Sequence, residues 1–122
     1  MTVKDLEKER AIFAYQCVEK ANSDKGLKDD YKSYVKKIPI MILTNGLGAT
    51  FAFIYSKNGN PYELIYTQTN KWLKRDDKKD LIDWIINLES SEYRAVTNEV
   101  LALFNWLKRF ADGMIEGEDN DS

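Results

Sequence analysis

Apolar residues recur at helical spacing along most of the chain, with charged residues between them. In residues 3–22 the apolar side chains repeat every three or four positions, and the pattern stops shortly before Gly26. This spacing predicts an amphipathic helix, because residues three and four apart share one helical face. A second helix is predicted from about Lys28 to the glycine at Gly46. Pro39 should kink or split it, because proline lacks the amide hydrogen that continues a helix.

Residues 48–57 are almost continuously apolar, so their periodicity fits a buried helix or a strand. The neighbouring sequence offers no second strand, and a lone strand would leave its backbone polar groups unpaired. A helix is therefore predicted here. The next helix is predicted over 61–75, with Asn60 as its cap and Pro61 at its first position.

The last helix shows the clearest pattern in the chain. A short charged helix containing Leu81 and Ile85 precedes it, and Ser90 or Ser91 is expected to cap it. Its apolar positions recur at steps of three and four as far as Gly113: Tyr93, Val96, Val100, Leu103, Phe104, Leu107 and Phe110. The chain is thus predicted to be all-α, a compact single-domain bundle of five or six helices over residues 1–111. Residues 112–122 are expected to form an acidic, disordered tail.

Composition narrows the possible functions. The chain of 122 residues has no histidine and a single cysteine, Cys17, so imidazole-based catalysis and Cys-cluster metal sites are excluded. Chemistry that uses only carboxylates or lysine stays open, but we expect no catalytic residues, no metal and no cofactor. No apolar run is long enough to span a membrane, and the charged N-terminus lacks the apolar segment of a signal peptide, so a cytoplasmic protein is expected.

Charge is unevenly distributed. Residues 112–122 hold five of the 20 acidic residues and no basic one, which leaves the remainder with 18 basic and 15 acidic residues. The overall formal charge of −2 therefore conceals a mildly basic body. That excess is too small to indicate nucleic-acid binding by itself.

Two basic faces are candidate binding surfaces. On the second helix, Lys28, Lys32 and Lys36 are spaced one turn apart, with Lys37 beside them. Such a row could follow phosphates, with Tyr31 or Tyr34 stacking on a base, although a solvated face would show the same pattern. On the last helix, one polar stripe carries further candidates: Arg94, Asn98, Asn105, Lys108 and Arg109. Arginine and asparagine together can contact phosphates, sugars and base edges.

Three other features have simpler interpretations. Trp72 and Trp84 are expected in the core, whereas Trp106 lies off the main apolar stripe and is a candidate protein-interface residue. The acidic residues near the fifth helix, namely Asp76, Asp77, Asp80 and Asp83, are typical of a solvated helix start and have no EF-hand spacing. The segment from Asn45 to Gly48 is interpreted as a sharp turn or a close approach of helices, because it lacks the residues of a phosphate loop.

Two longer stretches resemble the signature regions of the small subunit of the type III-B CRISPR Cmr (RAMP) effector complex. They are YKSYVKKIPIMILTNGLGATFAFI over 31–54 and EYRAVTNEVLALFNWLKRFADG over 92–113. The resemblance extends over nearly the whole chain, but residues 57–90 share only a general aromatic pattern. The acidic tail is not part of it.

The resemblance implies a non-catalytic protein that acts in antiviral defence. Several copies would stack beside the backbone and large subunits and align target RNA paired to guide RNA. It singles out Lys32, Lys36, Lys37, Arg94, Asn98, Lys108 and Arg109 for RNA contact, with Asn45 as a further hydrogen-bonding residue, and Trp106 for packing between copies. A helical protein-interaction adaptor without a nucleic-acid role stays open as the alternative, and a small hydrolase that uses the acidic group is a weaker one.

Overall fold

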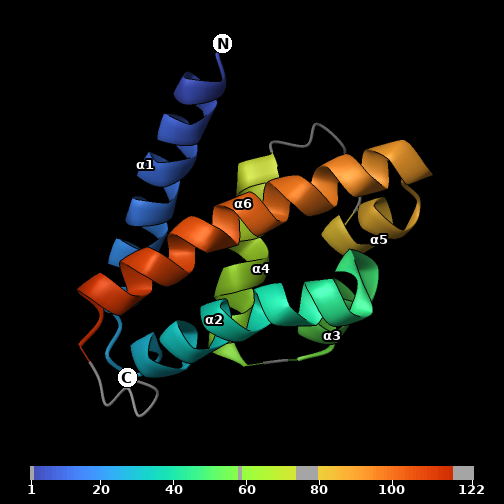
Figure 1. Cartoon of the computed structure of the whole chain (residues 1–122). Helices are drawn as coiled ribbons and strands as arrows, with labels where there is room; N and C mark the ends of the chain where they lie inside the picture. Colours follow the sequence, from blue (N-terminus) through green and yellow to red (C-terminus); the bar gives the residue numbers. More distant parts are fainter. Residues whose placement is uncertain (1, 58, 74–79, 117–122) are drawn as a thin grey trace.

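In the computed structural model, residues 2–57, 59–73 and 80–116 are described, and all regular structure among them is helical (Figure 1). The helices are α1 (Val3–Asn22), α2 (Lys28–Asn45), α3 (Leu47–Ser56), α4 (Asn60–Leu73), α5 (Leu81–Ile86) and α6 (Ser90–Met114). The all-α prediction is therefore confirmed. None of the described helices is both long and apolar enough to cross a membrane.

Helix α1 begins with a capping box. The Thr2 hydroxyl accepts a hydrogen bond from the Asp5 amide at 3.1 Å, and the Thr2 amide donates to the Asp5 carboxylate at 3.3 Å. These bonds satisfy amides that have no partner within the helix. The second half of α1 enters the core through Ala14 and Val18, which are fully buried.

Helix α2 continues through Pro39, so the predicted split does not occur. It ends at Gly46, whose φ of +91° belongs to the region that favours glycine. The chain then turns directly into α3, and the Thr50 hydroxyl donates to the Gly46 carbonyl at 2.8 Å. The ambiguous segment is thus a helix, as predicted, and it buries Leu47 and Phe51 completely.

Helix α6 organises the bundle. It runs across one side of the molecule with α1 and α2 packed on either flank (Figure 1). The predicted apolar face is buried at Val100, Leu103, Phe104 and Leu107, each at most 1% exposed. Burial of such a face stabilises the helix more than the intrinsic preferences of its residues do.

A buried polar residue joins three helices in the core. The Tyr31 hydroxyl of α2 donates to the Gln68 side-chain carbonyl of α4 at 2.7 Å, and the Gln68 amide donates to the Cys17 carbonyl of α1 at 3.2 Å. Gln68 was absent from the predicted core. It is tolerated there because both ends of its amide have partners.

Several predicted boundaries are wrong by one or more residues. Glu89 occupies the cap position of α6 and Ser90 is already helical, so neither predicted serine is the cap. Helix α4 begins at Asn60, the predicted cap itself. Leu43 follows the apolar pattern of α2, yet it is 75% exposed. Such shifts are common because the end of a helix is set by tertiary contacts as well as local sequence.

The end of the domain also differs from the prediction. Helix α6 passes through residue 111 and Gly113 to Met114, and Ile115 is only 2% exposed. The Met114 carbonyl accepts a hydrogen bond from the Asn22 side chain at 3.1 Å, which stabilises this end against the helix-breaking tendency of glycine. Residues 112–116 therefore belong to the folded domain, and residues 117–122 of the predicted tail lie outside the described residues.

Candidate nucleic-acid interface

Two lysines of α2 contact the C-terminal end of α6. Lys36 Nζ lies 2.8 Å from Asp112 Oδ1, and Lys32 Nζ donates to the Ile115 carbonyl at 3.1 Å. The last turn of α6 contains no basic residue of its own. Lysines from the neighbouring helix therefore supply the positive charge that favours a helix C-terminus.

Neither tyrosine of α2 is available for the stacking on a base that the sequence suggested. Tyr31 is fully buried, and the half-buried Tyr34 ring already stacks on Tyr62 at 4.3 Å between centroids. Lys37 leans toward the same ring, with its ammonium 5.9 Å from the Tyr34 centroid. Lys37 therefore faces α4, whereas Lys32 and Lys36 face α6.

The polar stripe of α6 forms an exposed ridge. We call it the α6 ridge: Arg94, Asn98, Asn105, Lys108 and Arg109. Arg94, Asn98, Asn105 and Arg109 are exposed, and Lys108 is half-buried. Within the described part of the chain, these side chains make no hydrogen bond or ion pair. Two arginines and two asparagines thus face outward along one helix without stabilising the fold through polar contacts.

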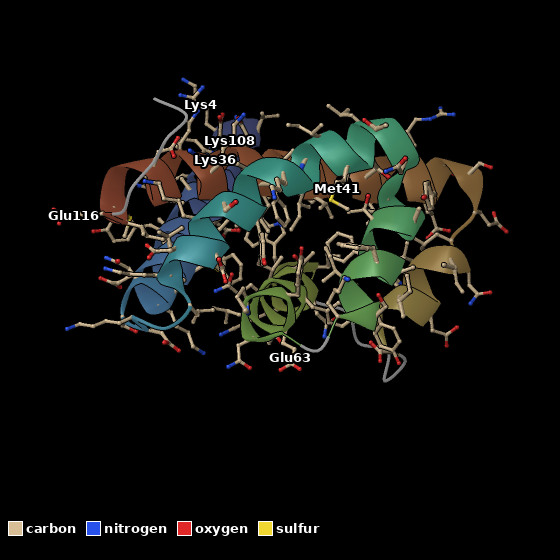
Figure 2. All side chains as sticks on the ribbon, turned by 90° about the horizontal axis from the view of Figure 1, so that it is seen from below. Lys4, Lys36, Met41, Glu63, Lys108 and Glu116 are labelled. Atoms are coloured by element: carbon tan, nitrogen blue, oxygen red, sulfur yellow. The ribbon has the colours of Figure 1, made fainter. Side chains whose placement is uncertain are left out.

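The two predicted basic faces meet at one end of the bundle. Lys108 precedes Asp112 by one helical turn, and Asp112 contacts Lys36 of α2. Figure 2 shows Lys36 and Lys108 at the same end of the molecule. The α2 lysines and the α6 ridge therefore share an edge and can act as one surface.

Trp106 belongs to an aromatic row between α6 and α1. Its ring stacks on Phe110 at 5.7 Å, and Phe110 meets the edge of Tyr15 at 5.4 Å. Trp106 is half-buried, and Tyr15 of α1 is exposed. Trp106 is thus held by its neighbours while part of its ring stays accessible. Of the other two tryptophans, Trp72 is buried as predicted and Trp84 is half-buried.

Glu99 connects three helices, a contact that sequence analysis did not identify. Its carboxylate accepts two hydrogen bonds from Arg10 of α1, at 2.8 and 2.9 Å, and one from the Trp72 indole of α4 at 2.8 Å. Burial raises the pKa of Glu99, but the hydrogen bonds from Arg10 and Trp72 outweigh it, and the net pKa is lowered. The Arg10 pKa is raised, chiefly by its hydrogen bonds to Glu99. The carboxylate therefore stays charged at neutral pH.

The acidic group near α5 makes local structural contacts. The Tyr66 hydroxyl donates to Asp80 and accepts from the Ile82 amide at 3.0 Å. Burial, followed by the hydrogen bond to Asp80, raises the pKa of Tyr66. Asp83 Oδ1 accepts from Asn87 at 2.9 Å, and Asp76 and Asp77 lie outside the described residues. Across residues 2–57, 59–73 and 80–116, no three potential metal ligands form a group.

The Asn45–Gly48 segment is the predicted sharp turn and also a close approach of helices. The Gly48 amide donates to the Tyr93 hydroxyl at 2.7 Å. A Cβ atom on Gly48 would lie 3.3 Å from that oxygen, so a larger residue would crowd the contact. The segment thus positions α3 against the first turns of α6.

Comparisons with known proteins place this helical domain among CRISPR-associated proteins. The family model described as "CRISPR-associated protein (Cas_Cmr5)" matches residues 6–114. The chain therefore belongs to the CRISPR-associated Cmr5 family. This result confirms the resemblance to the Cmr small subunit, and the matched region contains both the α2 lysines and the α6 ridge.

Individual relatives agree with the family match. The CRISPR system Cmr subunit Cmr5 of Thermus thermophilus is 29% identical over 103 residues, covering 84% of this chain and 90% of the relative. The Cmr5 subunit of Thermotoga maritima is 29% identical over 126 aligned positions, covering 100% of this chain and 94% of the relative. The crystal structure of a Cmr5 family protein from Thermus thermophilus has a TM-score of 0.82 at 28% identity, covering 95% of this chain and 100% of that one.

Proposed function

We propose that the protein is a non-catalytic, cytoplasmic subunit of a CRISPR Cmr complex that aligns target RNA paired to guide RNA. Several copies would stack beside the backbone and large subunits. The α6 ridge is the observation that carries the RNA-binding part of this proposal. Its arginines and asparagines face outward and have no polar contacts with the described part of the chain, so the fold does not require their charge or hydrogen-bonding groups.

The geometry of the ridge fits a nucleic-acid backbone. From Arg94 to Arg109 the helix rises about 22 Å, which is long enough to follow several phosphates. Arginine binds phosphate oxygens in pairs, while asparagine can reach sugars and base edges. Lys36 adjoins the ridge through Asp112 and extends the positive surface onto α2.

The test uses complexes assembled with guide RNA and a labelled complementary target RNA. Replacing Arg94 and Arg109 by alanine is expected to weaken binding and reduce the salt slope of log K by about 1–2, because lost phosphate contacts release fewer counterions. The matched control replaces Lys57 and Lys71, which lie outside the ridge. If both pairs give the wild-type slope, the ridge does not contact RNA and the adaptor alternative is favoured.

The contact between copies is proposed to include Trp106. Large aromatic side chains are common anchors of protein interfaces, and the partly accessible Trp106 ring is held by Phe110. Trp106→Ala should lower the number of copies retained in the assembled complex, measured by native mass spectrometry. Trp84→Ala provides a comparison at the other half-buried tryptophan. Wild-type copy number in the Trp106→Ala complex would remove Trp106 from the interface.

A further inference from the structure

Two pairs of apolar side chains are exposed on different sides of the bundle. Helix α1 presents Ile12 and Tyr15, which are 50% and 46% exposed, and the end of α2 presents Ile40 and Leu43, which are 65% and 75% exposed. Figure 1 shows α1 and the end of α2 on opposite flanks of α6. The two pairs therefore cannot cover each other within one chain.

The α1 pair continues into the aromatic row that contains Trp106. Tyr15 meets the edge of Phe110, and Phe110 stacks on Trp106. Ile12 lies one helical turn before Tyr15, on the same side of α1. One partly accessible apolar surface thus extends from α6 onto α1. We call it the α1 face: Ile12, Tyr15, Trp106 and Phe110.

A stack of several copies needs two different surfaces on each copy. If one surface met itself, the contact would close a pair and leave nothing for a third copy. The α1 face therefore needs a different partner surface on the next copy. Among the large apolar side chains exposed in the described part of the chain, only Ile40 and Leu43 lie one turn apart outside α1.

The two exposed pairs have the same spacing and the same charged continuation. Both pairs are three residues apart, and a charge follows about one turn further when α1 is read forward and α2 backward. The positions are Ile12, Tyr15 and Glu19 on α1, and Leu43, Ile40 and the neighbours Lys36 and Lys37 on α2. In an antiparallel pair of helices, these positions lie opposite one another in the same order.

Charge favours the antiparallel direction. In that direction the exposed Glu19 lies opposite Lys36 and Lys37, of which Lys36 already contacts Asp112 and Lys37 is exposed. The parallel direction would instead place Lys8, one turn before Ile12, opposite the same two lysines. Like charges that face each other across an interface oppose the contact.

We propose that the α1 face of one copy receives Ile40 and Leu43 of the next copy, with α1 and α2 antiparallel. The inference rests on the proposed function, which supplies the stacking of copies. Two helical turns cover less than the roughly 1,200–2,000 Å² of a stable interface, so the contact is weak between isolated chains. Copies held side by side in the complex meet at high effective concentration, which favours the contact there.

Disulfide formation in the assembled complex tests which residues meet. A mixture of Ile12→Cys chains and Leu43→Cys chains should give a linked dimer on a non-reducing gel, because a disulfide needs Cβ atoms about 4 Å apart. A mixture of Ile12→Cys and Ile40→Cys chains, the pair expected from a parallel contact, should give much less. The native Cys17 is buried, and wild-type complexes provide the blank.

Three results would overturn the proposal. They are the absence of a link between positions 12 and 43, equal yields from the two mixtures, and an equal yield from Leu43→Cys chains alone. The last result would mean that the α2 surface meets itself. All the changed side chains are exposed, so these variants should keep the fold.

Charge reversal tests the direction independently. Glu19→Lys and Lys37→Glu should each lower the number of copies retained in the complex, and the two changes together should restore it, as measured by native mass spectrometry. Lys37 is changed because Lys36→Glu would also repel Asp112. Glu7→Lys makes the same charge change at an exposed position of α1 outside the face and should have no effect. If the combined change restores no copies, the antiparallel contact is wrong.

The inference and the proposed function fail in different ways. If Trp106→Ala lowers the copy number but positions 12 and 43 do not link, the copies stack through another partner surface and only this inference is overturned. If the wild-type complex holds a single copy, the proposed stacking fails and the inference fails with it. RNA binding by the α6 ridge is measured separately by its salt slope, so neither result decides it.

Discussion

The hydroxyl of Tyr93 in α6 accepts a hydrogen bond from the backbone amide of Gly48 in α3 at 2.7 Å. The Gly48 amide lies in the first turn of its helix, where amides have no partner within the helix. One phenol therefore satisfies an α3 amide and joins two residues that are 45 positions apart in sequence.

Tyr93→Phe should lower the free energy of unfolding by about 1–2 kcal/mol, because it leaves the Gly48 amide without its acceptor. Urea unfolding followed by circular dichroism measures the change. Tyr55→Phe is the matched control, since the Tyr55 side chain is 55% exposed, and it should change stability by less than about 0.5 kcal/mol. Equal effects in the two variants would contradict a structural role for the Tyr93 hydroxyl.

Leu103→Ala should destabilise the domain by about 2–5 kcal/mol, because Leu103 is fully buried at the centre of the α6 face and its removal leaves a cavity. Leu43→Ala makes the same chemical change at a side chain that is 75% exposed and should have little effect. The difference between their unfolding midpoints checks the assignment of the core. Similar midpoints would mean that one of the two burial assignments is wrong.

Glu99→Gln should destabilise the domain by about 1–3 kcal/mol at neutral pH, because Arg10 loses its partly buried counter-charge. The effect should depend on pH. The Glu99 pKa lies below its ordinary value of 4.5 in the folded chain, so the unfolded chain binds protons more readily. The stability from Glu99 is present above pH 4.5 and is lost as pH falls through the lower folded pKa.

The measurement is the free energy of unfolding of wild type and Glu99→Gln at several pH values from about 7 to about 3, a range that spans the ordinary glutamate pKa. The gap between the two proteins should narrow once the pH falls below that ordinary pKa of 4.5. Glu19→Gln, at an exposed position of α1, provides the control and should show no such gap. A gap independent of pH would indicate that packing, rather than the carboxylate charge, stabilises this contact.

The Cys17 thiol should react with a disulfide reagent only when the domain opens. Burial in the core raises its pKa to about 12, an effect that the charges of Lys71 and Lys20 only partly oppose. The reactive species is the thiolate, so native protein at about pH 8 should react orders of magnitude more slowly than denatured protein. Release of thionitrobenzoate measures the rate. A fast reaction in native buffer would contradict the burial of Cys17.

Periodicity predicted the helices because it reports which side of each segment is apolar. It could not predict Gln68 in the core, since the partners that permit its burial are Tyr31 and the Cys17 carbonyl on two other helices. Leu43 shows the opposite error. It follows the apolar pattern of α2, yet it lies near the helix end where no described element covers it, so it is 75% exposed.

For the candidate site, the sequence predicted which residues share a helical face, but it did not predict how the two helices meet. The spacing of Lys32 and Lys36 correctly placed them on one face, but only the folded chain reveals that this face meets the end of α6. The α6 ridge needed no tertiary information, because its members are neighbours on one helix. The contacts of Glu99 could not be predicted from sequence, since its partners Arg10 and Trp72 lie on two other helices.

The contacts of Glu99 should limit which substitutions related proteins tolerate at the residues around it. An apolar residue at position 99 would leave Arg10 without the carboxylate that balances its charge and would remove the hydrogen bond from the Trp72 indole to Glu99. Each replacement would therefore be tolerated best when the others have already changed. Among relatives of this chain, positions 10, 72 and 99 are expected to covary, although they lie far apart in sequence and on three different helices.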